Sequence, residues 1–392
     1  MSALSTFRPT TFPGVTQGFP RTARFGILTA YPPTLCGLAT FGAGLVDGLI
    51  ANGASVNVVR VADGELSASD RVIGELATGS PASVAACAEL LNQSDVAVIQ
   101  YACGAYGSVD GDDVIGIIDG LRVPSIVIAH TIVKSPTRRQ RSVFEMIAAQ
   151  ADQVVVVSEA AGARLRSGFA VDRRKIVTVA HGAAVPPNVS GGRGRRPTVL
   201  TWGLLGPGKG IERVIEAMKT LRGLPGRPRY IVAGPTHPKT LAAEGEAYRD
   251  ARIEQARRGG VADAVSFDAG YRNAAMLTAL VQSAAVVVLP YDSTHQDVSG
   301  VLVDAIANGR PVVATAFPHA VEVLCTGAGT VVAHDDQDAL VAALRRVLTD
   351  PRFAGSMAAE ARRLAPDMAW PVVAGSYQKL AHQLLAGRRR NV

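Results

Sequence analysis

The chain has 392 residues, more than one hydrophobic core normally organises, so we expect two domains of about 190 residues each. Its formal net charge is +7, but six of the positive side chains lie in a Gly-rich linker and at the C-terminus: Arg193, Arg195, Arg196, Arg388, Arg389 and Arg390. The folded lobes are therefore nearly neutral, and nucleic-acid binding has little support. The four cysteines are scattered and no apolar run approaches about 18 residues, which argues against a zinc site, a disulfide framework and a membrane span, and favours a cytoplasmic protein.

The first half of the chain alternates short apolar strands with helices. After a Thr/Pro/Gly-rich tail, Arg24 to Ala30 is the first expected buried strand. The loop that follows it lacks Gly-x-Gly-x-x-Gly, which argues against a nicotinamide dehydrogenase. Because the strands are rich in Val and Ile throughout, they predict a parallel sheet covered by helices on both faces. Further strands are expected at 56–61, 95–100, 125–129 and 153–157, with helices near 38–52, 82–91, 112–121 and 139–151.

Two polar positions in this half are candidates for chemistry. Asp110-Gly-Asp112 imitates a metal-binding Asp-x-Asp pair, but apolar positions of a helix follow it at once. Capping of that helix is therefore the favoured interpretation, and no metal site is predicted. His130 directly follows the strand at 125–129, and ligands of parallel sheets bind at the carboxyl ends of strands. A single histidine is more often structural, so this position alone does not establish a site.

The second half opens on a strand, a glycine loop and a helix between Val199 and Lys219. Such a loop lets backbone N–H groups and a helix N-terminus meet an anion, and Lys209 lies within reach of a phosphate. The segment also matches the P-loop of nucleoside triphosphatases, except that Gly210 stands where that motif needs Ser or Thr to hold magnesium. An ordinary strand-to-helix turn with a solvated lysine is the alternative. The loop glycines are Gly203, Gly206, Gly208 and Gly210.

The remaining sequence continues the alternation of strands and helices. Strands are expected at 230–233, 265–267 and 285–289, and helices at 241–258, 274–283, 339–348, 353–364 and 370–384. No internal repeat or low-complexity segment competes with this pattern.

Three motifs together resemble family 4 glycosyltransferases. Gly-Leu-Leu-x-Pro-x-Lys-Gly from Gly203 resembles their donor diphosphate loop. Tyr-Pro-Pro-x-x-Cys-Gly-x-Ala-Thr-Phe from Tyr31 and Gly-x-Thr-His-Pro from Gly234 are similar to turns of one subgroup. The resemblance covers residues 24–385 and implies the GT-B fold, which is two Rossmann-like, doubly wound α/β lobes with an interdomain cleft. It divides the chain into a tail (1–22), an acceptor-side lobe (23–186), a linker (187–197), a nucleotide-sugar lobe (198–366), a helix returning to the first lobe (367–386) and a basic tail (387–392).

The resemblance also assigns roles to single residues. Gly37 would let the backbone approach the donor sugar and its diphosphate, and His130 would face the donor sugar. Lys209 would hold the diphosphate, with Gly203 and Leu204 beside it. Leu204 departs from the family, because many relatives have an arginine there, and this leaves Lys209 as the identified cation.

Family 4 enzymes carry two glutamates eight positions apart, with the N-terminus of a helix between them. Asp304 stands at the second position, which binds the ribose hydroxyls, and Gln296 at the first, which contacts hydroxyls of the donor sugar. Asp297 is adjacent and could replace Gln296 through a register shift. The helix N-terminus would receive a phosphate; its residues are Ser299, Gly300 and Val301.

The activity implied is retaining transfer of a hexose, mannose or glucose, to a hydroxyl of a saccharide, a polyol or a lipid-linked sugar. His130, Lys209 and Gln296 are the catalytic candidates. The nucleotide sugar, GDP-mannose or UDP-glucose, is a co-substrate, and no metal or other cofactor is expected to be obligatory. Two alternatives stay open: a GT-B sugar phosphorylase, and a nucleotide-sugar-binding regulator without catalysis, which Gln296 favours. Weak contact with a membrane surface and a homo-oligomer stay open as well.

Overall fold

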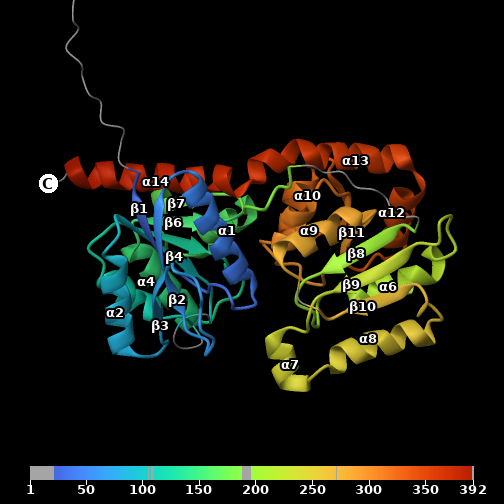
Figure 1. Cartoon of the computed structure of the whole chain (residues 1–392), viewed down its shortest axis with the longest axis horizontal. Coiled ribbons are helices and arrows are strands. Elements are labelled where there is room, and N and C mark those ends of the chain that lie inside the picture. The colour runs from blue at the N-terminus through green and yellow to red at the C-terminus, as the bar shows by residue number, and fades with distance from the viewer. Residues whose placement is uncertain (1–21, 105, 107–109, 188–195, 271, 391–392) are drawn as a thin grey trace, which may run out of the picture.

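A computed structural model gives the structure of residues 22–104, 106, 110–187, 196–270 and 272–390. These residues form two α/β lobes that lie side by side, and the last helix runs along the first lobe (Figure 1). Almost all of the expected N-terminal tail and most of the expected linker fall outside the described residues.

The first lobe is built on a seven-stranded parallel sheet in the order β3-β2-β1-β4-β5-β6-β7. Its strands are β1 (Arg24–Thr29), β2 (Ser55–Val61), β3 (Val72–Leu76), β4 (Val96–Tyr101), β5 (Ser125–Ala129), β6 (Gln153–Val156) and β7 (Ile176–Thr178). Its helices are α1 (Gly37–Ala51), α2 (Pro81–Leu91), α3 (Asp113–Asp119), α4 (Arg138–Gln150), α5 (Glu159–Gly168) and the short η1 (Arg173–Lys175). Successive residues of β1 point to opposite faces, because Ile27 packs against α1 and Leu28 against the side that bears α2, α3 and α4.

The second lobe has a six-stranded parallel sheet in the order β10-β9-β8-β11-β12-β13. Its strands are β8 (Thr198–Trp202), β9 (Arg229–Ala233), β10 (Val265–Asp268), β11 (Val286–Leu289), β12 (Val312–Thr315) and β13 (Gly329–Val332). Its helices are α6 (Ile211–Leu221), α7 (Pro238–Glu244), α8 (Ala247–Arg258), α9 (Ala274–Ser283), α10 (Gly300–Ala307), α11 (Pro318–Leu324), α12 (Gln337–Thr349), α13 (Pro351–Leu364) and the short η2 (Ala365–Met368). The expectation of two doubly wound lobes is confirmed.

Both sheets reverse their winding direction at one point. In the first lobe the chain moves outward from β1 through β2 to β3 and then restarts at β4 on the other side of β1. The second lobe repeats this between β8 and β11. Ligands of open α/β sheets bind outside the carboxyl ends of the strands at such a switch point, because the loops there diverge.

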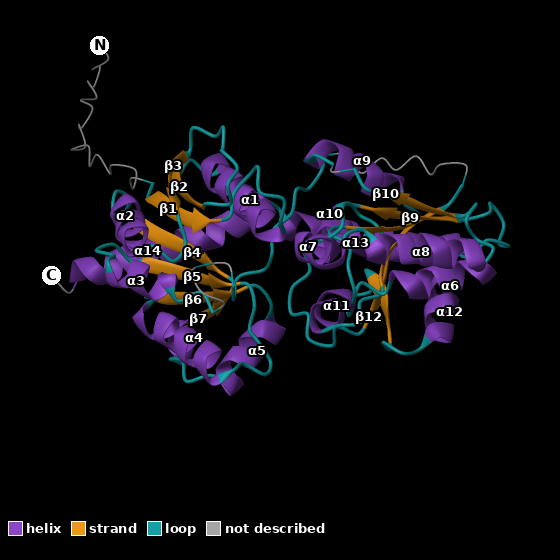
Figure 2. Ribbon diagram, turned by 90° about the horizontal axis from the view of Figure 1, so that it is seen from below, coloured by secondary structure: helices purple, strands orange, loops and turns teal. Residues whose placement is uncertain are grey.

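The last helix, α14 (Trp370–Arg390), packs on α1 of the first lobe, as Figures 1 and 2 show. The indole of its first residue, Trp370, packs directly against the backbone of two glycines. A Cβ added at Gly44 would lie 2.1 Å from the indole, and one added at Gly182 would lie 2.4 Å from it. The two chain segments that cross between the lobes are joined where Ala183 N–H donates to Met368 O at 2.7 Å. The start of α14 is therefore packed against both of the chain segments that pass from one lobe to the other.

Three details differ from the sequence-based expectations. The helix expected over 241–258 is interrupted at Gly245, whose φ of 62° ends α7 before α8 begins. The basic segment expected as a tail continues α14 as far as Arg390, and Arg388 donates to Arg122 O at 2.7 Å. Asp112 occupies the N-cap position of α3, but its carboxylate makes no capping bond and pairs instead with Arg139 at 2.7 Å.

Two helical glycines should respond oppositely to alanine. A Cβ at Gly48 of α1 would lie 2.5 Å from the carbonyl oxygen of Trp370, so we expect Gly48→Ala to force α14 away and cost about 1–3 kcal/mol. Gly355 in α13 has no atom within 4 Å of its Cβ position, so Gly355→Ala should stabilise its helix by about 1 kcal/mol. Thermal denaturation of both variants tests this, and a Gly48→Ala protein as stable as the wild type would contradict the packing described.

Candidate functional site

The candidate residues lie at the carboxyl ends of strands near both switch points. Gly37 follows β1 and His130 follows β5 in the first lobe, while the glycine loop follows β8 and the segment 290–299 follows β11 in the second. The lobes touch here, because the Cβ position of Gly300 lies 3.2 Å from Nε2 of His181, at the end of the first lobe. The start of α10, which the sequence predicts to bind a phosphate, therefore adjoins the first lobe.

The shape of the glycine loop depends on residues without a side chain. Gly210 has a φ of 65°, and a Cβ there would lie 1.7 Å from Pro290 O, so neither Ser nor Thr fits. This excludes the magnesium-holding hydroxyl of a P-loop at this position. The turn from Gly234 to Pro238 supports the loop from the side: a Cβ at Gly234 would lie 2.1 Å from Gly203 O, and Leu205 N–H donates to Pro235 O at 2.9 Å. The Gly-x-Thr-His-Pro motif thus has a structural role here.

Lys209 is a cation for which the described residues provide no anionic partner. Its ammonium lies 4.6 Å from the ring centre of Tyr291, which is buried and stacked on Phe317. Burial lowers the pKa of Lys209. Asp292, the acidic residue next to Tyr291, pairs with Arg213 of α6. Within the described residues, no carboxylate or other acceptor bonds to the Lys209 ammonium, so the loop presents an unneutralised positive charge.

The N-terminus of α10 lies against the glycine loop. Val301 Cγ2 is 3.7 Å from the Cβ position of Gly203, and Leu204 follows on the loop, partly exposed. Ser299 caps the helix by accepting from Leu302 N–H at 3.2 Å. The first N–H groups of a helix have no acceptor inside it, so this end of α10 favours an anion close to the glycine loop.

Asp304 and Gln296 approach this helix start from different positions. Asp304 lies in the second turn of α10, partly exposed, and its carboxyl makes no hydrogen bond or ion pair with the part of the chain that the structure describes. Burial raises the pKa of Asp304 to about 7. Gln296 Nε2 donates to Val298 O at 3.1 Å, and its backbone carbonyl accepts from His319 N–H at 3.4 Å. The amide group of Gln296 therefore helps to hold its own loop.

Asp297 is engaged elsewhere. Its side chain is 5% exposed and forms an ion pair with Arg164, which comes from α5 of the first lobe. Burial raises the pKa of Asp297, and the charge of Arg164 acts against that rise. Asp297 is therefore committed to a contact with the first lobe, whereas the Gln296 side chain is not.

His130 belongs to a small aromatic cluster at the end of the first lobe. Phe41 of α1 lies edge-on to His130 and His181, with ring centres 4.6 and 5.0 Å apart. Burial lowers the pKa of His130 to about 3 and that of His181 to about 4, so both imidazoles are neutral near pH 7. The Nε2 atom of His130 is buried and has no hydrogen-bond partner among the described residues. A neutral imidazole can offer a ligand a hydrogen bond but no charge.

Two further histidines lie at the site, although neither was assigned a role there from the sequence. His181 contacts the start of α10, and His319 accepts from Ser299 N–H through Nδ1 at 2.9 Å. His319 must therefore carry its proton on Nε2, and burial lowers its pKa to about 3. His319 is the second residue of the short helix α11 and lies 20 positions after Ser299. No local sequence pattern indicates that these two residues are in contact.

Gly37 begins α1 in open surroundings. No atom of the described residues outside its chain neighbours and its own helix backbone lies within 4 Å of its Cβ position, so a ligand could approach its backbone there. The preceding loop is held by Arg60, a fully buried arginine that donates to Tyr31 O at 3.1 Å and to Thr34 Oγ1 at 2.9 Å. Arg60 lies within the apolar strand β2, and the sequence around it does not indicate that its side chain holds the loop before α1.

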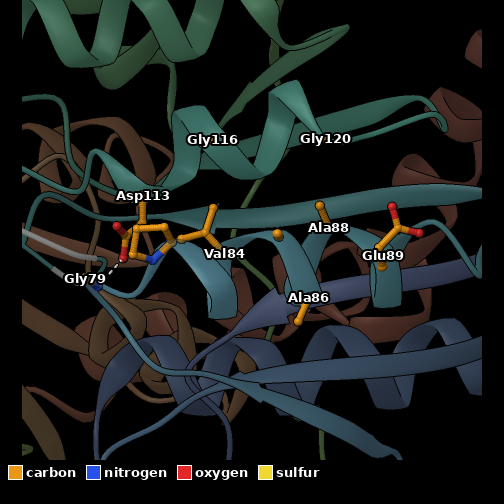
Figure 3. A pocket seen from close by; sticks show the side chains of 10 residues that line it. Gly79, Val84, Ala86, Ala88, Glu89, Asp113, Gly116 and Gly120 are labelled. Carbon is orange, nitrogen blue, oxygen red and sulfur yellow. Dashed lines mark hydrogen bonds between the residues drawn. The ribbon is translucent and has the colours of Figure 1, made fainter.

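A separate groove of about 610 Å³ lies between α2 and α3, on the side of the first lobe away from the second (Figures 1 and 3). Small side chains line most of it, and Figure 3 shows Asp113 and Glu89 near its two ends. It contains none of the candidate residues. Across the described part of the chain, no group of three or more His, Cys, Asp or Glu side chains is placed to hold a metal ion. Within that same part, no helix is long and apolar enough to cross a membrane.

Comparison with known proteins gives a family match for the second lobe and structural matches for most of the chain. Residues 187–364 match the family model of "Glycosyl transferases group 1". No curated protein sequence gives a significant match to the chain. Among solved structures, a sucrose-phosphate synthase from Thermosynechococcus elongatus is 18% identical, with 93% of this chain and 99% of that chain covered and a TM-score of 0.72.

Two further solved structures are similar over nearly their whole length. HepE from Anabaena, in complex with UDP and glucose, is 16% identical, with 92% of this chain and 100% of that chain covered and a TM-score of 0.74. An α,α-trehalose-phosphate synthase from Burkholderia xenovorans is 13% identical, with coverage of 92% and 99% and a TM-score of 0.69. At these identities the likeness establishes the fold, which is GT-B.

Proposed function

We propose that this glycosyltransferase of the GT-B fold transfers a hexose, glucose or mannose, from a nucleoside diphosphate sugar to a hydroxyl of a saccharide or another small acceptor, with retention of configuration. The match of the second lobe to the group 1 family supports glycosyl transfer. The donor, the stereochemistry and the acceptor are our own assignments. UDP-glucose is the first donor to test, because HepE from Anabaena was solved with UDP-glucose and the fold is shared.

The observation that carries the proposal is the unneutralised charge of Lys209. A partly buried ammonium without a carboxylate is costly unless a ligand supplies the anion. The glycine loop that carries Lys209 also contacts the N-terminus of α10, through Gly203 and Val301, and both the loop and the helix end favour an anion. A diphosphate fits this arrangement, because it brings negative charge to all three groups.

The transfer step needs little further chemistry from the protein. The bond between the anomeric carbon and the β-phosphate oxygen breaks, a bond forms between that carbon and the acceptor hydroxyl oxygen, and the hydroxyl proton passes to the leaving diphosphate. Until it takes that proton, the diphosphate gains negative charge. Lys209 and the helix N-termini would stabilise this charge more than that of the intact donor, which is how fixed charges accelerate a reaction. Neutral His130 would position the sugar by a hydrogen bond through Nε2. Asp304 would accept hydrogen bonds from the ribose.

A regulator that binds a nucleotide sugar without turnover is the second candidate. Gln296 favours it, because an amide cannot supply the charge that a glutamate would bring to this position, and here its Nε2 is already bonded to Val298 O. Such a protein would keep the unpaired Lys209 and Asp304 but lose catalysis.

A donor panel separates these functions. Purified protein is incubated with UDP-glucose, GDP-mannose and related nucleotide sugars, with and without saccharide and polyol acceptors, and nucleoside diphosphate release is measured. We expect release from one donor, and NMR of the product should show the anomeric configuration of that donor. Nucleotide binding without release would favour the regulator. Cleavage of a disaccharide by inorganic phosphate without nucleotide would indicate a phosphorylase, and an inverted product would refute retention.

A further inference from the structure

Helix α5 of the first lobe contacts the second lobe at its N-terminus. Glu322 of α11 accepts hydrogen bonds from Glu159 N–H at 3.0 Å and from Ala160 N–H at 3.1 Å. The next N–H, that of Ala161, is capped within the lobe by Ser158 at 3.1 Å. A carboxylate at a helix N-terminus is favoured by the free N–H groups and by the helix dipole. The second lobe thus accepts two of the first three N–H groups of a first-lobe helix.

One turn further along α5, Arg164 makes a second contact between the lobes. Its Nη1 donates to Ile132 O of its own lobe at 3.1 Å, to His295 O of the second lobe at 3.4 Å and to the Asp297 carboxylate. Its side chain is 19% exposed. Beside it, Lys134 Nζ lies 3.5 Å from His295 Nε2. Arg164 therefore joins loops of both lobes through a single guanidinium.

The segment that Arg164 holds is the one that carries the donor-sugar candidate. Asp297 is the neighbour of Gln296, and His319 binds the same segment: its N–H donates to Gln296 O, and its Nδ1 accepts from Ser299 N–H. The segment is thus held by a first-lobe arginine and by a second-lobe histidine. Its position on the first-lobe side depends on Arg164.

We propose that Arg164 and Glu322 form an interlobe clasp on α5 that places Gln296 and the start of α10 for the donor, which makes Arg164 a positioning residue for sugar transfer. This inference rests on the proposed function. The clasp joins the lobes in the state in which the sugar subsite is assembled. When it is released, the lobes separate and Gln296 loses its position, while the nucleotide contacts within the second lobe remain.

The energetics suit a contact that opens and closes. Burying an ion pair removes both groups from water, and the attraction between them roughly offsets this loss. Asp297 Oδ1 is buried without a partner among the described residues, so the pair is not fully satisfied in the joined state. Upon separation, water can solvate both ions, and Ser158 still caps α5 when Glu322 leaves. Neither the helix nor the charges prevent opening.

The test compares Arg164→Ala with Arg166→Ala. Arg166 lies on the same helix, but its ion pair is with Glu159 of α5 itself, at 3.7 Å. We expect Arg164→Ala to lower kcat with the nucleotide sugar by about tenfold or more, because a misplacement of about 1 Å can cost about 100-fold. Its Kd for the free nucleoside diphosphate should change by less than about twofold, because the proposed nucleotide contacts lie within the second lobe. A twofold change corresponds to about 0.4 kcal/mol, since each 1.4 kcal/mol is tenfold. Small-angle scattering should show a larger radius of gyration, and Arg166→Ala should match the wild type throughout.

A charge exchange distinguishes a clasp from a merely structural arginine. Arg164→Glu and Asp297→Arg should each lower kcat and expand the protein, and the two together should restore part of both. Unchanged kcat and radius in Arg164→Ala, parallel losses of melting temperature and nucleotide binding, or no rescue by the exchange would overturn the clasp. If the wild type turns over no nucleotide sugar, the proposed function fails, and the scattering of the same variants still decides whether the clasp joins the lobes.

Discussion

Replacing Lys209 by alanine should lower turnover at least tenfold, and by about 100-fold or more if the effect equals that of one charge-stabilising donor in well-studied active sites. In the proposed function its ammonium is the cation that the glycine loop offers to a diphosphate; it lies over the Tyr291 ring, and no carboxylate of the described residues pairs with it. Stability should remain nearly unchanged, because the desolvation cost of the ammonium disappears together with its attraction to the ring. Steady-state kinetics and thermal denaturation of the same preparation measure both.

Two substitutions give this prediction its controls. Lys209→Met keeps the apolar stem and removes the charge, so it should lose activity as Lys209→Ala does. Lys219→Ala removes an exposed lysine from the same segment, where it pairs with Glu216 at 2.7 Å, and should have no effect on turnover. Equal losses of melting temperature and activity in Lys209→Ala would identify a structural lysine and remove the main support for the proposed function.

The features predicted from the sequence are those with a local cause. The glycine loop was predictable because strand, turn and helix follow one another within about twenty residues and each has its own residue preferences. The strand ends that carry His130 and Lys209 were placed for the same reason. The two-lobed fold followed from alternating strands and helices together with motif resemblance, and the two sheets confirm it.

The features missed from the sequence depend on contacts between distant segments. Arg164 and Asp297 are 133 positions apart, and neither residue type signals a partner in the other lobe. Arg388 is held in α14 by Arg122 and Asp152 of the first lobe, whereas three consecutive arginines alone suggest a solvated tail. Gly245 ends α7 because it adopts a positive φ, and a single glycine within a polar run does not reveal that choice.

Asp304 should make nucleotide binding depend on pH. Its pKa is raised to about 7 by burial, above the value of about 3.9 for an exposed Asp. The folded protein thus keeps a proton that the unfolded chain releases, so the stability contribution of Asp304 falls as pH rises from about 4 to about 7. Ribose hydroxyls donate to the carboxylate and favour its ionised form. Binding should therefore release a proton near pH 6, and affinity should rise between pH 6 and pH 8. In Asp304→Asn this rise should vanish, apart from the part due to the phosphates of the ligand.

The final prediction is that Asp304→Ala and Gln296→Ala fail in different ways. Asp304→Ala should weaken binding of free nucleoside diphosphate and of intact donor alike, by roughly 10- to 150-fold, because a charged hydrogen bond is worth about 1.5–3 kcal/mol. Gln296→Ala should leave free diphosphate binding unchanged and weaken only the intact donor. Calorimetry on both variants measures the affinity for free nucleoside diphosphate and the affinity for the intact donor. Asp297→Ala serves as the third arm: it breaks the pair with Arg164, so it should lower kcat, expand the protein and weaken the intact donor only as far as Arg164→Ala does. If Gln296→Ala leaves binding of the intact donor unchanged and Asp297→Ala weakens it more than Arg164→Ala does, the donor sugar contacts Asp297 and the register is shifted by one; if neither Gln296→Ala nor Asp297→Ala weakens it beyond Arg164→Ala, this segment does not bind the sugar.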